Sequence, residues 1–242
     1  MTMAHKVLLK SLAFLIAGAL AVHAENSAAT PVPRESEKWK AKHEAINQRV
    51  QQGNVDLLWI GDSIVERWAD DGKRTWNKYY APRNAANLGI SGDCTEHVLW
   101  RLQNGNIEGI RPKLAIVMIG QNNGPHNTAE EIAEGVLRIV DTLRAELPET
   151  KILLLSITYR GQYPNEEQPR LQAASDITAK AADDKHVFYL DMHKVFLNAD
   201  GSIPKKLMSD YEHPSATGFR LWAKTIEPEV ARLMGDAPVG RP

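Results

Sequence analysis

Several features that mark particular classes of protein are rare or missing in this sequence. Cys94 is the only cysteine among the 242 residues, which excludes an intramolecular disulfide and a zinc site made of clustered cysteines. The formal net charge is only −1, so the basic excess expected of a nucleic-acid-binding protein is missing. No segment repeats within the chain. The composition, with 43% hydrophobic and 24% charged residues, is typical of a globular protein, and the length suits one substantial domain.

A long hydrophobic run is also missing, and the longest apolar stretch lies near the amino terminus. It spans Leu12–Val22 and is shorter than the roughly 20 residues that a membrane-spanning helix needs. Lys6 and Lys10 come before or at its start, and Ala24 offers a small residue at which the chain can be cut. This order predicts a secretory signal peptide at residues 1–24, and therefore a secreted or periplasmic protein. A retained membrane-anchoring helix is the alternative; after cleavage, no stable membrane span is expected.

The rest of the chain divides into a short polar segment, one domain and a tail. Residues 25–37 are polar, contain two prolines and show no periodicity, which predicts a flexible linker. We expect the folded domain to occupy residues 38–235 and a frayed tail to occupy residues 236–242. Within the domain, five short apolar runs are typical of buried strands. They lie at residues 55–60, 83–89, 114–119, 152–158 and 187–190.

Segments with helical spacing of apolar residues connect these five runs, and this alternation decides the fold class. Strands joined by helices through short connections form a parallel sheet that is covered on both faces. We therefore expect an α/β protein, a three-layer α/β/α sandwich with five parallel strands in the flavodoxin-like order 2-1-3-4-5. Thr128 is predicted to cap one helix together with Glu131, and Pro214 is predicted in the first turn of the last helix.

The first strand ends abruptly in Gly61-Asp62-Ser63, and a helical segment follows. This order places Ser63 at the carboxyl end of a strand, where ligands bind in open α/β sheets. The backbone N–H groups of a first helical turn have no partner within the helix. A serine hydroxyl beside them can therefore attack a carbonyl group while they stabilise the oxyanion. An isolated serine in this place is more often a simple helix cap, so the other turns must decide between the two interpretations.

Three further polar turns supply the other groups that acyl transfer needs. His213 is the natural base, and Asp210 is close enough in sequence to fix the tautomer of its ring. The backbone N–H of Gly92 and the side-chain amide of Asn122 can join the N–H of Ser63 in one oxyanion hole. Each residue also has an ordinary structural explanation, as a turn glycine, a loop asparagine or a helix-start pair. Together they predict a serine hydrolase with Ser63, Asp210 and His213 as catalytic residues.

At these turns the sequence resembles the SGNH hydrolases, also called GDSL-like hydrolases, which are named after a Ser, a Gly, an Asn and a His in four blocks. The matching blocks are Gly61-Asp62-Ser63, Gly92, Gly120-Gln121-Asn122 and Asp210-Tyr211-Glu212-His213. The stretches N-L-G-I-S-G-D-C-T-E-H-V-L-W-R-L-Q-N-G and R-P-K-L-A-I-V-M-I-G-Q-N-N look closer still to the α-type subunits of platelet-activating-factor acetylhydrolase. The resemblance extends roughly from Val55 to Met234.

The resemblance implies the SGNH hydrolase fold and ester hydrolysis through an acyl-enzyme, with no metal and no cofactor. Carried over by position, it makes Ser63 the nucleophile, Gly92 and Asn122 oxyanion donors, and Asp210 and His213 the rest of the triad. Two positions depart from the family pattern. Ile64 stands where the motif has Leu, and Asn123 follows Asn122 where many relatives have Asp.

The substrate stays open at this point, because the predicted signal peptide departs from the intracellular enzymes. We expect the protein to hydrolyse short-chain esters, above all acetyl esters, with an O-acetylated carbohydrate as the substrate. A phospholipid or lysophospholipid is the first alternative, and a non-catalytic carbohydrate- or surface-binding module on the same fold is the second. The binding module is disfavoured because it needs no base–acid pair.

Other chemically active residues fit ordinary structural roles better than catalytic ones. A thiol nucleophile at Cys94 with His97 as its base lacks a third group to orient the base. Asp191 and His193, at the end of the last strand, fit a structural role better than catalysis. A metal-dependent hydrolase would need a cluster of ligands that the sequence pattern does not suggest.

Overall fold

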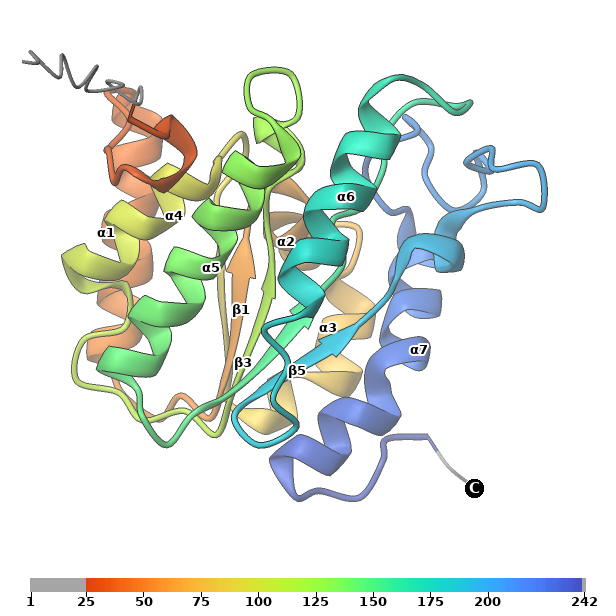
Figure 1. Ribbon diagram of the computed structural model, residues 1–242. Coiled ribbons are helices and arrows are strands. Elements are labelled where there is room, and N and C mark those ends of the chain that lie inside the picture. Colours follow the sequence, from red (N-terminus) through yellow and green to blue (C-terminus); the bar gives the residue numbers. More distant parts are fainter. Residues whose placement is uncertain (1–24, 241–242) are drawn as a thin grey trace, which may run out of the picture.

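The computed structural model describes residues 25–240, and the predicted signal peptide at residues 1–24 lies outside this range. A five-stranded parallel sheet forms the centre of the domain (Figure 1). Its strands are β1 (Leu57–Gly61), β2 (Ala85–Gly89), β3 (Leu114–Met118), β4 (Lys151–Leu155) and β5 (Val187–Leu190). They are hydrogen-bonded in the order β2-β1-β3-β4-β5, which confirms the order predicted from the sequence.

Helices cover both faces of this sheet, which confirms the predicted three-layer arrangement (Figure 1). The helices on one face are α1 (Glu37–Gln51), α4 (Thr95–Arg101) and α5 (Ala129–Glu146), and those on the other are α3 (Lys73–Tyr79) and α7 (Ala216–Met234). Helix α6 (Glu167–Ala179) packs beside α5. Within residues 25–240, no helix combines the length and the apolarity that crossing a membrane requires.

Alternate residues of the central strands supply two separate cores. In β1, Leu57 and Trp59 belong to the core beneath α3 and α7, whereas Leu58 and Ile60 belong to the core beneath α1, α4 and α5. Successive side chains of a strand point to opposite faces, so a sheet covered on both sides needs strands that are apolar throughout. The five residues of β1 are all buried, as are those of β3.

The ends of two helices show how local sequence sets the element boundaries. The Thr128 hydroxyl accepts a hydrogen bond from the Glu131 N–H (3.2 Å), and the Glu131 carboxylate accepts one from the Thr128 N–H (2.9 Å), so the predicted capping box is confirmed. The prediction for Pro214 is wrong. Ser215 caps α7 through its hydroxyl, and Pro214 lies before the helix, in an isolated bridge with Met208. A serine cap satisfies a helical N–H that proline cannot.

The segment expected as a flexible linker, residues 25–37, is instead packed on the domain. It forms a short 3₁₀ turn, η1 (Ser27–Ala29), beside α4 and α5. Ala28 is fully buried, and its carbonyl oxygen accepts a hydrogen bond from the Thr95 hydroxyl (2.7 Å). A Cβ on Gly135 of α5 would lie 2.4 Å from that carbonyl oxygen, so this glycine makes room for the turn. Composition alone does not reveal such partners, because they lie about 70 to 110 residues further along the chain.

The expected frayed tail, residues 236–242, is also held where the structure describes it. The Asp236 carboxylate accepts a hydrogen bond from Arg83 Nε (2.9 Å), and the Val239 N–H donates one to Glu227 Oε1 (2.7 Å). Arg83 and Glu227 themselves form a buried ion pair. The tail up to residue 240 is therefore held by hydrogen bonds to two side chains whose positions are already fixed.

The helix that begins with Ser63, α2 (Ser63–Glu66), packs directly on the end of β2. Asp62 caps this helix, since its Oδ1 accepts a hydrogen bond from the Ile64 N–H at 2.9 Å. A Cβ on Gly89 would lie 2.2 Å from the Glu66 backbone nitrogen and 2.8 Å from the Asp62 carbonyl oxygen. Only glycine at the end of β2 permits this close approach. The approach fixes the direction in which the chain leaves β1, and therefore the position of Ser63.

Substitution of Gly89 measures the importance of this contact. Gly89→Ala should lower the free energy of unfolding by about 3 kcal/mol or more, because the new methyl group overlaps backbone atoms that cannot rotate away. Gly53→Ala is the matched control: Gly53 has φ of +68° and nothing within 4 Å of the Cβ position, so the cost is about 1–2 kcal/mol of backbone strain. Urea denaturation measures both. Equal losses would contradict the steric explanation for Gly89.

Candidate active site

The five residues predicted from the sequence all lie on segments that follow strands or precede α7. Ser63 begins α2 directly after β1, Gly92 lies in the turn after β2, and Asn122 lies in a 3₁₀ turn, η5 (Gln121–Asn123), after β3. Asp210 and His213 lie in the segment before α7. Since β1, β2 and β3 are parallel neighbours, the turns that follow them share the carboxyl end of the sheet.

The structure brings Ser63, His213 and Asp210 into direct contact. His213 Nε2 lies 2.9 Å from Ser63 Oγ, and His213 Nδ1 lies 2.8 Å from Asp210 Oδ2. The side chain of His213 is 13% exposed, compared with 44% for Asp210. The three side chains therefore form a hydrogen-bonded chain that runs from the start of α2 to the segment before α7, across 150 residues of sequence.

The charge of Asp210 decides which ring nitrogen of His213 carries the proton. Burial by itself raises the pKa of this carboxyl group, but hydrogen bonds from the His213 N–H, the His213 ring and the Glu212 N–H outweigh it and lower the pKa to about 2. Arg67 Nη1 lies 3.8 Å from the same carboxylate. An ionised carboxylate can only accept, so His213 Nδ1 must donate to it. In the neutral ring, Nε2 is then free to accept the proton of Ser63 Oγ.

The groups expected to form the oxyanion hole lie on the turns that follow β1, β2 and β3. The Asn122 amide donates one hydrogen bond to the Asp93 carbonyl oxygen (2.9 Å), which leaves its second N–H available. Within residues 25–240, the backbone N–H groups of Ser63 and Gly92 have no protein acceptor. Gly92 has φ of +77°, a conformation that side chains disfavour, so the turn needs glycine at this position. The arrangement offers three unpaired N–H donors to a ligand.

The residues that hold these donors in place were not predicted from the sequence. The Glu66 carboxylate accepts hydrogen bonds from the backbone N–H (2.6 Å) and the hydroxyl group of Ser91, which ties α2 to the turn that carries Gly92. Asn123 is fully buried; its Oδ1 accepts the Thr95 N–H (3.0 Å) and so joins η5 to the start of α4. A third link is the ion pair between Asp93, which follows Gly92, and Arg101 of α4. These are ordinary charged and polar residues whose role depends on distant partners.

Cys94 and His97 do not form a second reactive pair. The His97 Nδ1 atom accepts a hydrogen bond from the Cys94 backbone N–H (2.9 Å), so the histidine serves the start of α4. Burial, together with the nearby carboxylates, raises the pKa of the Cys94 thiol to about 12, and a protonated thiol is a poor nucleophile and a poor metal ligand. Ligand atoms of Cys94, Glu96 and His97 lie within 4.8 Å of one another.

The contacts of Asp191 and His193 indicate a structural role and not a catalytic one. His193 is 5% exposed; its Nδ1 lies 2.8 Å from Asp191, and its ring stacks on Tyr159 with 4.5 Å between the ring centroids. Ser175 Oγ lies 3.5 Å from His193 Nε2, which resembles a second catalytic chain. However, the Ser175 hydroxyl is fully buried and already donates to the Leu171 carbonyl oxygen (2.8 Å), so it has no access to a substrate.

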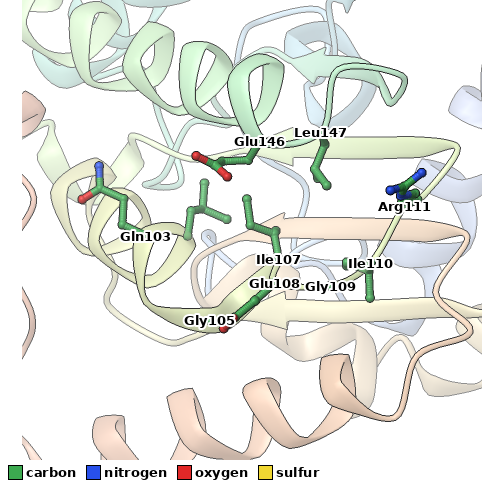
Figure 2. A pocket seen from close by; sticks show the side chains of 10 residues that line it. Gln103, Gly105, Ile107, Glu108, Gly109, Ile110, Arg111, Glu146 and Leu147 are labelled. Atoms are coloured by element: carbon green, nitrogen blue, oxygen red, sulfur yellow. The ribbon is translucent and has the colours of Figure 1, made fainter.

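A separate cavity has a volume of about 650 Å³, and Figure 2 shows the residues that line it. The loop between α4 and β3 and the end of α5 line it, with Ile107, Arg111 and Glu146 among its residues. Because β3 begins at Leu114, directly after this loop, the cavity lies at the amino-terminal end of the strands. None of the five predicted site residues lines it.

Comparisons with known proteins relate the chain to lipases and acylhydrolases. The model of the GDSL-like lipase/acylhydrolase family matches residues 59–221. The chain is similar to the platelet-activating factor acetylhydrolase IB subunit alpha1 of Bos taurus, with 31% identity over 229 residues, which cover 90% of this chain and 97% of the relative. It is also 34% identical over 202 residues to a Drosophila melanogaster homologue of the beta subunit, covering 82% of this chain and 87% of the relative.

Solved structures show the same fold at lower identity. A GDSL-like lipase from Bacteroides thetaiotaomicron has a TM-score of 0.64 and 15% identity, covering 81% of this chain and 96% of that chain. A carbohydrate acetylesterase family member from Sinorhizobium meliloti has a TM-score of 0.57 and 18% identity, covering 74% of this chain and 98% of that chain. The arrangement of the sheet and helices is therefore shared with several ester hydrolases.

Asp62, directly before Ser63, gives the site a measurable pH dependence of stability. It is 1% exposed, and its Oδ2 has no hydrogen-bond partner among the described residues. Burial, reinforced by Asp93 and Glu212, raises its pKa to about 7. Between about pH 4, the ordinary pKa of an aspartic acid, and pH 7, the folded protein keeps this proton while the unfolded chain has lost it. Asp62 therefore makes the free energy of unfolding fall as pH rises through this range.

Asp62→Asn should remove that dependence, because the amide oxygen still accepts the Ile64 N–H but the side chain no longer titrates. Relative to the unsubstituted protein, the stability of the variant should rise between about pH 4 and pH 7 and level off above pH 7. Urea denaturation of both proteins at unit steps from pH 4 to pH 8 provides the measurement. A stability difference that is the same at every pH would show that Asp62 is ionised throughout.

Proposed function

The chain belongs to the GDSL-like lipase/acylhydrolase family and is an ester hydrolase, and we propose that it hydrolyses short-chain esters, above all acetyl esters, with Ser63, His213 and Asp210 as catalytic triad. The observation that carries the proposal is the position of the His213 ring. It lies within hydrogen-bond distance of both the Ser63 hydroxyl (2.9 Å) and the Asp210 carboxylate (2.8 Å). A non-catalytic binding module on the same fold has no need of either contact.

The proposed reaction begins when Ser63 Oγ attacks the ester carbonyl carbon. His213 Nε2 accepts the hydroxyl proton as the Oγ–C bond forms, and the ionised Asp210 stabilises the imidazolium through Nδ1. When the tetrahedral intermediate collapses, the bond from carbon to the alcohol oxygen breaks and His213 returns the proton to the leaving alcohol. A water molecule, deprotonated by His213, then attacks the acyl carbon; the bond from this carbon to Ser63 Oγ breaks, His213 returns the proton to Oγ, and the carboxylic acid is released.

Negative charge develops on the carbonyl oxygen in both steps. The three available donors, namely the N–H groups of Ser63 and Gly92 and the second N–H of the Asn122 amide, are assigned to this oxygen. Such donors act mainly in the transition state, and removal of one typically lowers the rate by about 10²–10³-fold. Ser63 therefore supplies both the attacking Oγ atom and one of the N–H groups that stabilise the oxyanion.

Two features support a short acyl group. The turn after β3 is closed by Gln121, which is 2% exposed and donates from Nε2 to the Thr158 carbonyl oxygen (3.0 Å). This bond joins η5 to the loop after β4, and we infer that the joined segments leave little room for a long acyl chain beside Asn122. The Bos taurus relative is, in addition, named an acetylhydrolase.

Polar and aromatic groups near the site support a hydrophilic leaving group, such as the sugar of an O-acetylated carbohydrate. Arg160 Nη1 lies 3.8 Å from Glu212, the residue before His213. On the loop that carries Arg160, Tyr163 is 63% exposed, and an exposed aromatic ring can stack on a sugar face. The name of the Bos taurus relative favours a phospholipid instead, which makes a phospholipid the second candidate. The export signal predicted at residues 1–24 fits an extracellular or periplasmic carbohydrate better than an intracellular lipid.

A series of p-nitrophenyl esters tests the proposed acyl preference. We expect kcat/KM to be highest for acetate and to fall through butyrate, octanoate and palmitate. An acyl tunnel would instead add about 0.8 kcal/mol of binding for each buried methylene group. Ser63→Ala should be folded and inactive on every ester, which controls for contaminating esterases. A maximum at octanoate or beyond would refute the short-chain proposal without affecting the assignment of Ser63.

The leaving group is tested with natural esters after the acyl preference is known. Release of acetate from an acetylated polysaccharide should exceed release from an acetyl phospholipid at equal ester concentration. The opposite order would support the phospholipid candidate, and equal, very slow release from both would indicate a different alcohol.

A further inference from the structure

The turn that carries Gly92 rests on a fully buried ion pair that the proposed mechanism does not use. Arg101 Nε lies 2.8 Å from Asp93 Oδ2, and both side chains are 0% exposed. Removing two charges from water costs several kcal/mol per ion, and the attraction between them often does no more than offset this cost. A buried pair of this kind is therefore weak evidence for stability, and its other contacts indicate a different role.

The Asp93 side of the pair holds the oxyanion donors. Besides Arg101, its carboxylate accepts a hydrogen bond from Trp39 Nε1 (2.7 Å) and lies 3.5 Å from Arg34 Nη1. Its backbone carbonyl oxygen accepts the hydrogen bond from the Asn122 amide (2.9 Å). Asp93 also follows Gly92 directly, so fixing Asp93 fixes both a neighbour of one proposed donor and the acceptor that orients another.

The Arg101 side of the pair reaches the strand that carries the nucleophile. Arg101 Nη2 donates to the Gly61 carbonyl oxygen (3.3 Å), two residues before Ser63. Arg101 Nη1 donates to Asn106 Oδ1 (2.6 Å), and Asn106 Nδ2 donates in turn to Asn47 Oδ1 of α1 (2.6 Å). A single planar guanidinium group therefore bonds to the end of β1, to the Gly92 turn and to the layer of helices behind them.

We propose that Asp93 and Arg101 are positioning residues of the oxyanion hole, which hold the Gly92 N–H and the Asn122 amide in fixed positions relative to Ser63. Neither side chain touches the substrate, because both are fully buried. The proposal rests on the proposed function, since it assigns the oxyanion to Gly92 and Asn122. Small displacements of oxyanion donors reduce transition-state stabilisation more than substrate binding, so the pair should affect kcat rather than KM.

The test is Arg101→Lys, which keeps the positive charge but replaces the planar fork of donors that bonds to three partners. With p-nitrophenyl acetate, kcat should fall at least tenfold while KM stays within about twofold. The matched control is Arg83→Lys. Arg83 forms the other buried ion pair described here, with Glu227 (2.8 Å, both side chains 5% exposed), and lies outside the site. It should lose comparable thermal stability and keep the kcat of the unsubstituted enzyme.

A cycle with Asn122→Ala separates a role in the oxyanion hole from a general structural role. Because the pair positions Asn122 as well as Gly92, Arg101→Lys should lower kcat less in the Asn122→Ala background, where one of the two positioned donors is already missing, than in the unsubstituted enzyme. Equal fold-losses in the two backgrounds, or a loss in Arg83→Lys as large as in Arg101→Lys, would overturn the proposal. If Asn122→Ala itself retains full kcat, the oxyanion assignment under the proposed function fails instead.

Trp39→Phe provides a second variant if Arg101→Lys does not fold. It removes one donor to the Asp93 carboxylate and leaves the ion pair in place, so we expect a smaller loss of kcat, of about two- to fivefold, with KM unchanged. If the single variant Trp39→Phe keeps the kcat of the unsubstituted enzyme, the proposed role of Asp93 is contradicted.

Discussion

The close contact between α2 and the end of β2 is the constraint on which the position of Ser63 depends. Gly89 has no side chain, so the backbone of Glu66 and Asp62 can lie where a Cβ would otherwise be. The chain must therefore turn sharply between β1 and α2, and this turn exposes Ser63 at the carboxyl end of the sheet. The same approach brings the Glu66 carboxylate to Ser91, so one glycine links the nucleophile to the turn that bears Gly92.

Two ionisable side chains are buried close to the site. Asp62 and Asp93 are buried with exposures of 1% and 0%, and burial raises the pKa of Asp62 to about 7. Asp93 has the Arg101 guanidinium as its partner, whereas Asp62 has only one hydrogen bond from a backbone N–H to its carboxyl group. Replacing these groups by apolar side chains would remove a desolvation cost. Their presence is explained by geometry: each holds a backbone segment that carries a proposed catalytic donor or nucleophile.

The sequence allowed the fold class, the strand order and all five proposed site residues to be predicted, because each depends on short local patterns. Continuous apolar runs mark strands that are buried on both faces, and turns after parallel strands meet at one edge. The sequence did not reveal Asp93 and Arg101, because a buried ion pair eight residues apart looks the same as two surface charges. The turn at Ala28 was missed for a similar reason: its partners on α4 and α5 are distant in sequence.

Covalent trapping of Ser63 is the most direct measurement of the proposed chemistry. An organophosphorus fluoride reacts with a serine whose hydroxyl is activated by a neighbouring base, and intact mass with peptide mapping locates the adduct. The triad described here predicts one adduct per chain, on Ser63, formed in step with the loss of esterase activity, and greatly slowed labelling of His213→Ala. Inhibition with the adduct on another residue, or full activity in protein with Ser63 completely modified, would contradict it.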